Sequence, residues 1–123
     1  MAITQVNLDP PSGAIVFKDT DNEGTKIAVK GSSATIYSII IDNTANAAEA
    51  EYVKLWNVAS GSVTVGTTAP DAIIMIPAAV KKTFAFPEGW VFGTALTVAT
   101  VTTAGTAGTT NPTASVVLVI VYV

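Results

Sequence analysis

The amino-acid sequence predicts an all-β protein, namely an antiparallel, jelly-roll-like β-sandwich with about eight to ten strands and little or no helix. Three observations lead to this fold class. β-Branched residues alternate with polar ones, turn-forming residues interrupt them about every eight to twelve residues, and no helical periodicity outlasts about two turns. The length of 123 residues predicts a single domain over positions 1–123, with residues 1–13 as an N-terminal arm or an edge strand.

The expected strands follow from this alternation, and residues that favour tight turns separate them. In chain order we expect strands near residues 3–8, 14–18, 25–30, 34–42, 50–58, 72–76, 80–86, 90–93, 96–103 and 114–123. The turns contain Gly, Pro, Asn or Asp and lie at Asp9–Gly13, Asp21–Gly24, Gly31–Ser33, Asp42–Thr44, Ser60–Gly61, Ala69–Asp71 and Pro87–Gly89.

The segment Phe86–Gly89 has the clearest turn composition. Proline presets φ at the second position of a type I turn, and glycine suits the fourth position. We therefore expect a hairpin that joins residues 83–86 to residues 90–92. Its aromatic side chains are expected in the hydrophobic core, because inward aromatics dominate small β cores. They are Phe84, Phe86, Trp90 and Phe92.

Two segments depart from the strand pattern. Residues 45–53 are the only ones with a helix-favouring composition, and this stretch is short. Residues 102–113 are rich in threonine, glycine and alanine, and we expect them to form a long exposed loop. Loops of that length are uncommon in compact domains unless they have a function or contact a partner.

Three of the expected strands are apolar on both faces, whereas a strand in a two-layer sandwich normally shows one polar face to water. They lie at residues 36–41, 73–76 and 116–123, and the last is apolar at every position. An uncovered strand of this kind would pair with other chains. The sequence therefore predicts that these strands are covered by another subunit or by a host surface. The alternative is that segment 45–53 and the long loops fold over the outer face.

The composition excludes most catalytic and nucleic-acid-binding chemistry. The chain has no histidine, cysteine or arginine, and its formal net charge is −3. The usual general base, thiol nucleophile and transition-metal ligands are therefore missing, and no basic surface can neutralise phosphates. The carboxylates show no pairing pattern, and there is no phosphate-binding loop. We predict a protein that is not an enzyme, uses no cofactor and binds no nucleic acid.

Neither a membrane-spanning segment nor an export signal is expected. The first residues lack a positively charged region followed by an apolar one, so they do not resemble a secretory signal. The longest apolar run, residues 116–123, is too short to span a bilayer as a helix.

The acidic segment that begins at Asp19 is similar to the start of an EF-hand loop. That loop requires a bidentate glutamate at its twelfth position, which is Lys30 here, so an EF-hand is rejected. A looser cation-binding turn that uses Asp19, Asp21 and Glu23 stays open, beside a simple polar hairpin turn.

The strand near residues 50–58 places Tyr52, Lys54 and Trp56 on one face. Two aromatic residues that flank a lysine favour packing in the core or at a subunit interface, and they could also stack on a sugar ring. Together with the C-terminal strand, they supply the candidate interface residues. These residues are Tyr52, Lys54, Trp56, Leu118, Ile120 and Tyr122.

The middle and the end of the chain carry an ordered series of strand and turn motifs. The motifs are Tyr37–Asn46, Tyr52–Asn57, Val63–Asp71, Phe86–Gly89, Leu96–Ala99 and Thr102–Gly105. In this order they resemble small β-sandwich virion structural proteins of tailed bacteriophages, of the capsid decoration or cement type. The resemblance covers roughly residues 34–123 and includes no chemical signature.

This resemblance implies a virion protein that is made in the host cytoplasm and sits on the outer capsid surface. It implies a homo-oligomer, with a trimer favoured over a dimer, that bridges subunits of the major capsid protein and stabilises the shell. The alternative is a carbohydrate-binding or adhesin module, or a tail-fibre module. A carbohydrate-binding role requires a solvent-exposed Tyr52–Trp56 face.

Overall fold

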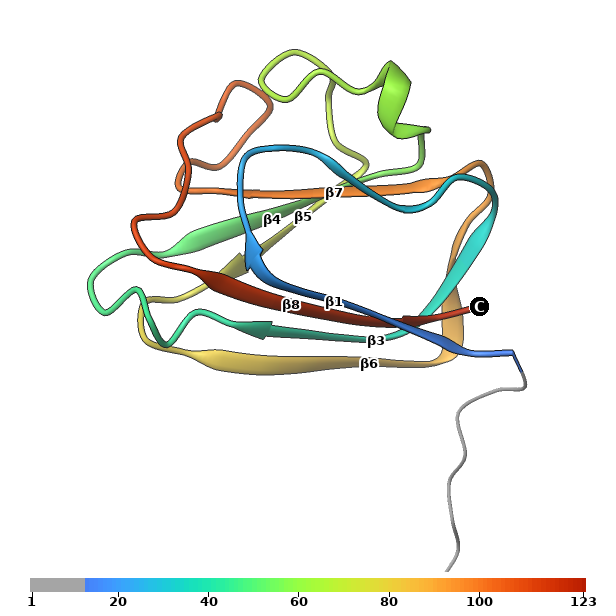
Figure 1. Cartoon of the computed structure of the whole chain (residues 1–123), viewed down its shortest axis with the longest axis horizontal. Coiled ribbons are helices and arrows are strands. Elements are labelled where there is room, and N and C mark those ends of the chain that lie inside the picture. Colours follow the sequence, from blue (N-terminus) through green and yellow to red (C-terminus); the bar gives the residue numbers. More distant parts are fainter. Residues whose placement is uncertain (1–12) are drawn as a thin grey trace, which may run out of the picture.

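The computed structural model describes residues 13–123, which form two antiparallel four-stranded sheets packed face to face (Figure 1). The strands are β1 (Ile15–Asn22), β2 (Ile27–Lys30), β3 (Ala34–Asp42), β4 (Glu51–Trp56), β5 (Ala72–Ile76), β6 (Lys81–Phe92), β7 (Leu96–Val101) and β8 (Val116–Tyr122), and a single 3-10 turn spans Ser60–Ser62. The strand orders are β1-β8-β3-β6 and β2-β7-β4-β5. Consecutive strands alternate between the sheets except β4 and β5, which is the order of a jelly roll. The predicted fold class is therefore confirmed.

The N-terminal prediction falls largely outside this description. The strand expected near residues 3–8 lies outside the described residues. So does the arm expected over residues 1–13, apart from Gly13.

The hydrophobic core lies between the two sheets, because alternate side chains of the strands point inward. Its buried members are Val29, Ala34, Ile36, Ile39, Ile41, Val53, Leu55, Ile76, Phe92, Leu96, Val98, Val116, Leu118, Ile120 and Tyr122. The aromatic cluster packs against this core, and the Trp90 ring centroid lies 5.2 Å from that of Phe86 and 4.9 Å from that of Phe92. The predicted core position of these aromatic residues is confirmed.

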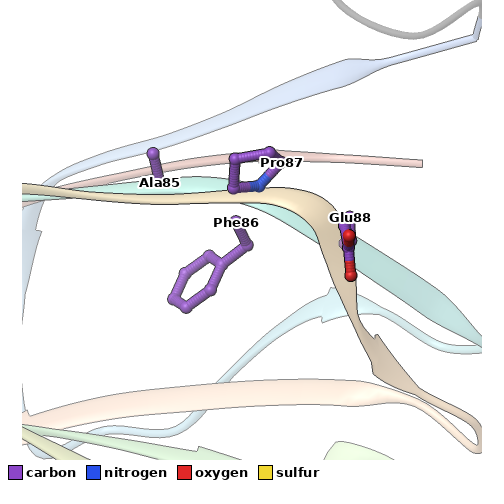
Figure 2. A pocket seen from close by; sticks show the side chains of 5 residues that line it. Ala85, Phe86, Pro87 and Glu88 are labelled. Atoms are coloured by element: carbon purple, nitrogen blue, oxygen red, sulfur yellow. The ribbon is translucent and has the colours of Figure 1, made fainter.

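The hairpin predicted at residues 86–89 is wrong. β6 continues through this segment and pairs with β3 on both sides of it. At that point residues 86–89 stand opposite Tyr37 alone, so the extra residues form a bulge and the strand bends (Figure 2). Pro87 is tolerated because β6 lies at the edge of its sheet. The bulge uses the same turn-forming residues that a hairpin would use.

The segment with helix-favouring composition forms no helix. Residues 43–50 are irregular turns, and β4 begins at Glu51. The buried Asn43 side chain donates to the carbonyl oxygens of Glu49 and Pro77 at 3.0 and 3.1 Å. Asn46 donates to Asn43 Oδ1 at 2.8 Å. These amides satisfy backbone groups that a helix would otherwise pair, so they stabilise the loop instead.

Two long loops, residues 57–71 and 102–115, cover the outer face of the second sheet and lie above β7 and β4 in Figure 1. Trp56 Nε1 donates to the Thr68 carbonyl oxygen at 3.0 Å and so holds the first loop. Every residue of β7 is buried, because the core covers one face of the strand and these loops cover the other. The alternative prediction, that long loops fold over an outer face, therefore holds for this sheet. Segment 45–53 does not form part of that cover.

Candidate functional site

Half of the predicted interface residues lie inside the molecule. Leu118, Ile120 and Tyr122 point into the core between the sheets. Their prediction as a contact surface does not fit the folded chain. Because both faces of β8 are apolar, the sequence could not show which face points inward.

The other three predicted interface residues lie on the outer side of the second sheet, beneath its covering loops. Trp56 and Lys54 are fully buried, and only Tyr52 is half-buried. Lys54 Nζ donates to the carbonyl oxygens of Thr106 and Gly108 at 3.1 and 2.8 Å. The Tyr52–Trp56 face is therefore no exposed platform for a sugar ring.

The outer face of the first sheet differs, because its centre is aliphatic and no described element lies over it (Figure 1). Val117, Val119 and Val121 of β8 point to this side. Ile40 of β3 lies opposite Val119, and Val16 of β1 lies opposite Val121. We call these five residues the outer valine face. Val16 is 62% exposed, and the other four are half-buried.

Polar side chains border the outer valine face. Lys18 and Ser38 lie in register with Val119 and Val121 on the neighbouring strands, and Asp42 lies opposite Val117. An apolar centre with a polar rim is the usual anatomy of a protein contact surface.

A second feature is the pair of carboxyl groups on Glu49 and Glu51. The Glu51 side chain is fully buried, and neither of its oxygens accepts a hydrogen bond from residues 13–123. Burial, followed by the nearby Glu49 carboxylate, raises the pKa of Glu51 to about 8. Glu51 therefore holds a proton at neutral pH, which it can donate to Glu49.

Glu49 is the ionised member of the pair. The hydrogen bond from Glu51 and bonds from Thr113 lower its pKa. Its carboxylate accepts from the Thr113 backbone N–H at 3.0 Å and from Thr113 Oγ1 at 3.2 Å. A hollow of about 310 Å³ lies beside Glu49, but Glu51 does not line it. Because Glu51 is sealed from solvent, the pair is suited to a structural role rather than to acid–base chemistry on a substrate.

The acidic turn after Asp19 is organised by hydrogen bonds within the chain. Asp19 accepts from the Asp21 backbone N–H and from Asn22 Nδ2, both at 3.0 Å. Asn22 in turn accepts from Thr100 Oγ1 at 2.6 Å, which ties the turn to β7. Within residues 13–123, no three acidic, histidine or cysteine side chains gather as a metal site would require.

A second hollow, of about 440 Å³, lies at the bend of β6 and opens to solvent. Figure 2 shows the Phe86 ring on one side of the strand, while Ala85 and Pro87 lie on the other. Of the described residues that line it, Glu88 alone is charged, so they supply no set of converging polar groups.

Comparison with known protein families, curated proteins and solved structures gives no match for this chain. Among residues 13–123, no helix has the length and apolar character needed to cross a bilayer.

The sequence contained a signal for one feature that our prediction missed. Glu49 and Glu51 lie two residues apart where the chain enters β4, so the sequence places two carboxyl groups close together at that point. The burial of Glu51 could not be predicted, because Glu51 precedes the core residues Val53 and Leu55 on the inward face of β4 and the sequence does not show which face points inward.

Proposed function

We propose that the protein is a non-enzymatic structural protein that decorates and stabilises a bacteriophage capsid, and that it binds the shell through the outer valine face. One observation carries the proposal: an aliphatic sheet face with a polar rim lies uncovered by the described chain. Monomeric proteins rarely expose extended apolar patches, and such patches mark interaction sites. The phage capsid as partner is inferred from the sequence resemblance.

The fold supports a structural role in a second way. Jelly rolls occur widely in viral capsid and lectin domains. Here the sheet that would contact the shell is backed by a full core, which gives the outer valine face a rigid support. A weak contact of this kind, repeated over the lattice by a homo-oligomer bound to the major capsid protein, would stabilise the shell through multivalency.

The alternative of a carbohydrate-binding module is less well supported. It needs an exposed aromatic platform, and Trp56 is buried beneath the loop at residues 57–71 with its indole N–H bonded to Thr68. The aromatic residues Phe86, Trp90 and Phe92 pack on the core side of β6.

The test is immunogold electron microscopy of phage particles whose genome encodes this protein. The antibodies are raised against the purified protein. Label spread over the outer surface of the heads supports the proposal. Label confined to tails or fibres, or found on no particle, contradicts it.

A binding assay on particles stripped of the protein then tests the surface itself. Val119→Glu places a charge at the centre of the outer valine face, so we expect binding to weaken by at least about tenfold. Ile27→Glu is the control, because Ile27 is exposed on the other sheet and the same charge there should leave binding unchanged.

A further inference from the structure

Among residues 13–123, β5 forms one edge of the second sheet and is hydrogen-bonded to β4 alone. No backbone hydrogen bond joins residues 72–76 to any other segment of the described chain. The N–H and C=O groups on the free side of β5 therefore offer a template for another strand.

The other three sheet edges carry features that discourage such pairing. The β1 edge has a register shift after Asp19, and β2 is only four residues long with a shift before Lys30. The β6 edge has a bulge and Pro87. Bulges, short strands, lysines and prolines are the usual means by which proteins protect sheet edges.

β5 has no bulge, lysine or proline, although with five residues it is only one residue longer than β2. Its pairing with β4 is regular along its whole length, and its sequence Ala-Ile-Ile-Met-Ile contains no charge, proline or glycine. On its outer side Ile73 is 37% exposed and Met75 is 51% exposed, and Met75 lies in register with the half-buried Tyr52. This edge is both unprotected and apolar.

We propose that β5 pairs with β5 of a second copy, antiparallel about a two-fold axis at Ile74, so that two second sheets join into one continuous eight-stranded sheet. In this register Ile73 lies directly opposite the partner's Met75, and Ala72 lies opposite the partner's Ile76. The exposed side chains of Ile73 and Met75 then pack against each other on the outer face. At each end of the pairing, the small Ala72 lies beside the larger Ile76.

The occupant is a second copy because the strand is complementary to itself. A charged edge strand would set like charges against each other in a two-fold pair, and residues 72–76 carry none. The pairing segment is also bounded alike in both copies, by Asp71 on one side and Pro77 on the other. The pairing would end at Pro77, because proline has no backbone N–H to donate to the partner strand.

This dimer deepens the proposed function, because it would supply the homo-oligomer that bridges shell subunits, with two-fold rather than three-fold symmetry. It uses a different surface from the outer valine face. A variant that loses the dimer should still bind stripped particles as a monomer. The dimer and the capsid contact can therefore be tested separately, and failure of one does not imply failure of the other.

Sedimentation equilibrium of the full chain, over concentrations up to about 1 mM, tests the pairing. We expect a monomer–dimer equilibrium whose dissociation constant rises at least about tenfold in Ile73→Lys. Ile27→Lys is the matched control, because Ile27 is also 37% exposed and lies on the opposite edge of the same sheet. Circular dichroism verifies that both variants fold.

Mixing two variants tests the register. Ile73→Lys and Met75→Glu should each dimerise poorly alone, whereas their mixture should form a heterodimer because the opposite charges face each other across the axis. A wild-type monomer at all concentrations, a trimer, equal weakening by Ile27→Lys, or no gain on mixing would each overturn this pairing.

Discussion

At the scale of single residues, two ionisable side chains on β4 illustrate different ways to bury a polar group. Glu51 lies on the core-facing side of the strand and keeps its proton, because no N–H or O–H of residues 13–123 is available to a carboxylate there. Lys54 lies beneath the loops, where burial lowers its pKa, and two carbonyl oxygens accept its hydrogen bonds. A buried polar group must find such a partner or lose its charge.

Glu51 predicts how stability depends on pH. Its pKa is higher in the folded state than its ordinary value of 4.5, so folding favours the protonated form. The stabilisation is complete below pH 4.5 and is lost as the pH rises towards about 8, by at most about 1.4 kcal/mol per pH unit. Urea unfolding at pH 5 and pH 8 should therefore show a less stable protein at pH 8.

Glu51→Gln should remove most of this slope, because the amide stays neutral and can still donate to Glu49. Glu88→Gln, at the exposed bend of β6, is the control and should leave the slope as in the wild type. A wild-type protein equally stable at the two pH values would contradict the protonated pair.

At the scale of elements, the bend of β6 depends on one glycine. Gly89 has a φ of +80°, and a Cβ atom there would lie 2.5 Å from Thr35 Cγ2 on the neighbouring strand. Gly105 has a similar φ of +83° in its loop, but no atom lies within 4 Å of a Cβ at that position. Both glycines avoid backbone strain, and only Gly89 also avoids a steric clash.

This comparison separates strain from packing. Gly105→Ala should cost about 1 kcal/mol of unfolding free energy, the usual penalty of a positive φ for alanine. Gly89→Ala should cost more, about 2–4 kcal/mol, because the Thr35 side chain must also shift to make room for the added Cβ. Urea denaturation of both variants measures the difference, and equal losses would show that the bend relaxes without cost.

At the scale of the whole molecule, the topology joins distant parts of the chain. β8 lies between β1 and β3 in the first sheet, and β7 lies between β2 and β4 in the second. Few of these neighbours are close in sequence, so loop-closure entropy must be overcome before the sheets can form.

We therefore expect slow folding for a chain of this size. Refolding from urea, followed by tryptophan fluorescence because Trp56 becomes buried, should take about milliseconds to seconds, as in other all-β sandwiches. Folding within microseconds would mean that local contacts dominate the transition state, which this strand order does not favour.

The fold was more predictable from the sequence than the candidate site was. Alternation and turn residues located seven of the eight observed strands, and β6 was the exception because a bulge and a hairpin share the same residue types. The site was harder to predict because β8 is apolar on both faces. The sequence indicated an apolar surface there, but it selected Leu118 and Ile120 rather than Val119 and Val121.

Local composition and a two-residue period were enough to predict the all-β character, most of the strand positions and the lack of histidine, cysteine and arginine chemistry. Which sheet faces remain open became clear from the folded arrangement of the loops. Loops at residues 57–71 and 102–115 bury one outer face, the other stays uncovered by the described chain, and β5 is left as an unprotected edge. Burial of a face depends on segments that are distant in sequence, and no local pattern specifies where those segments lie.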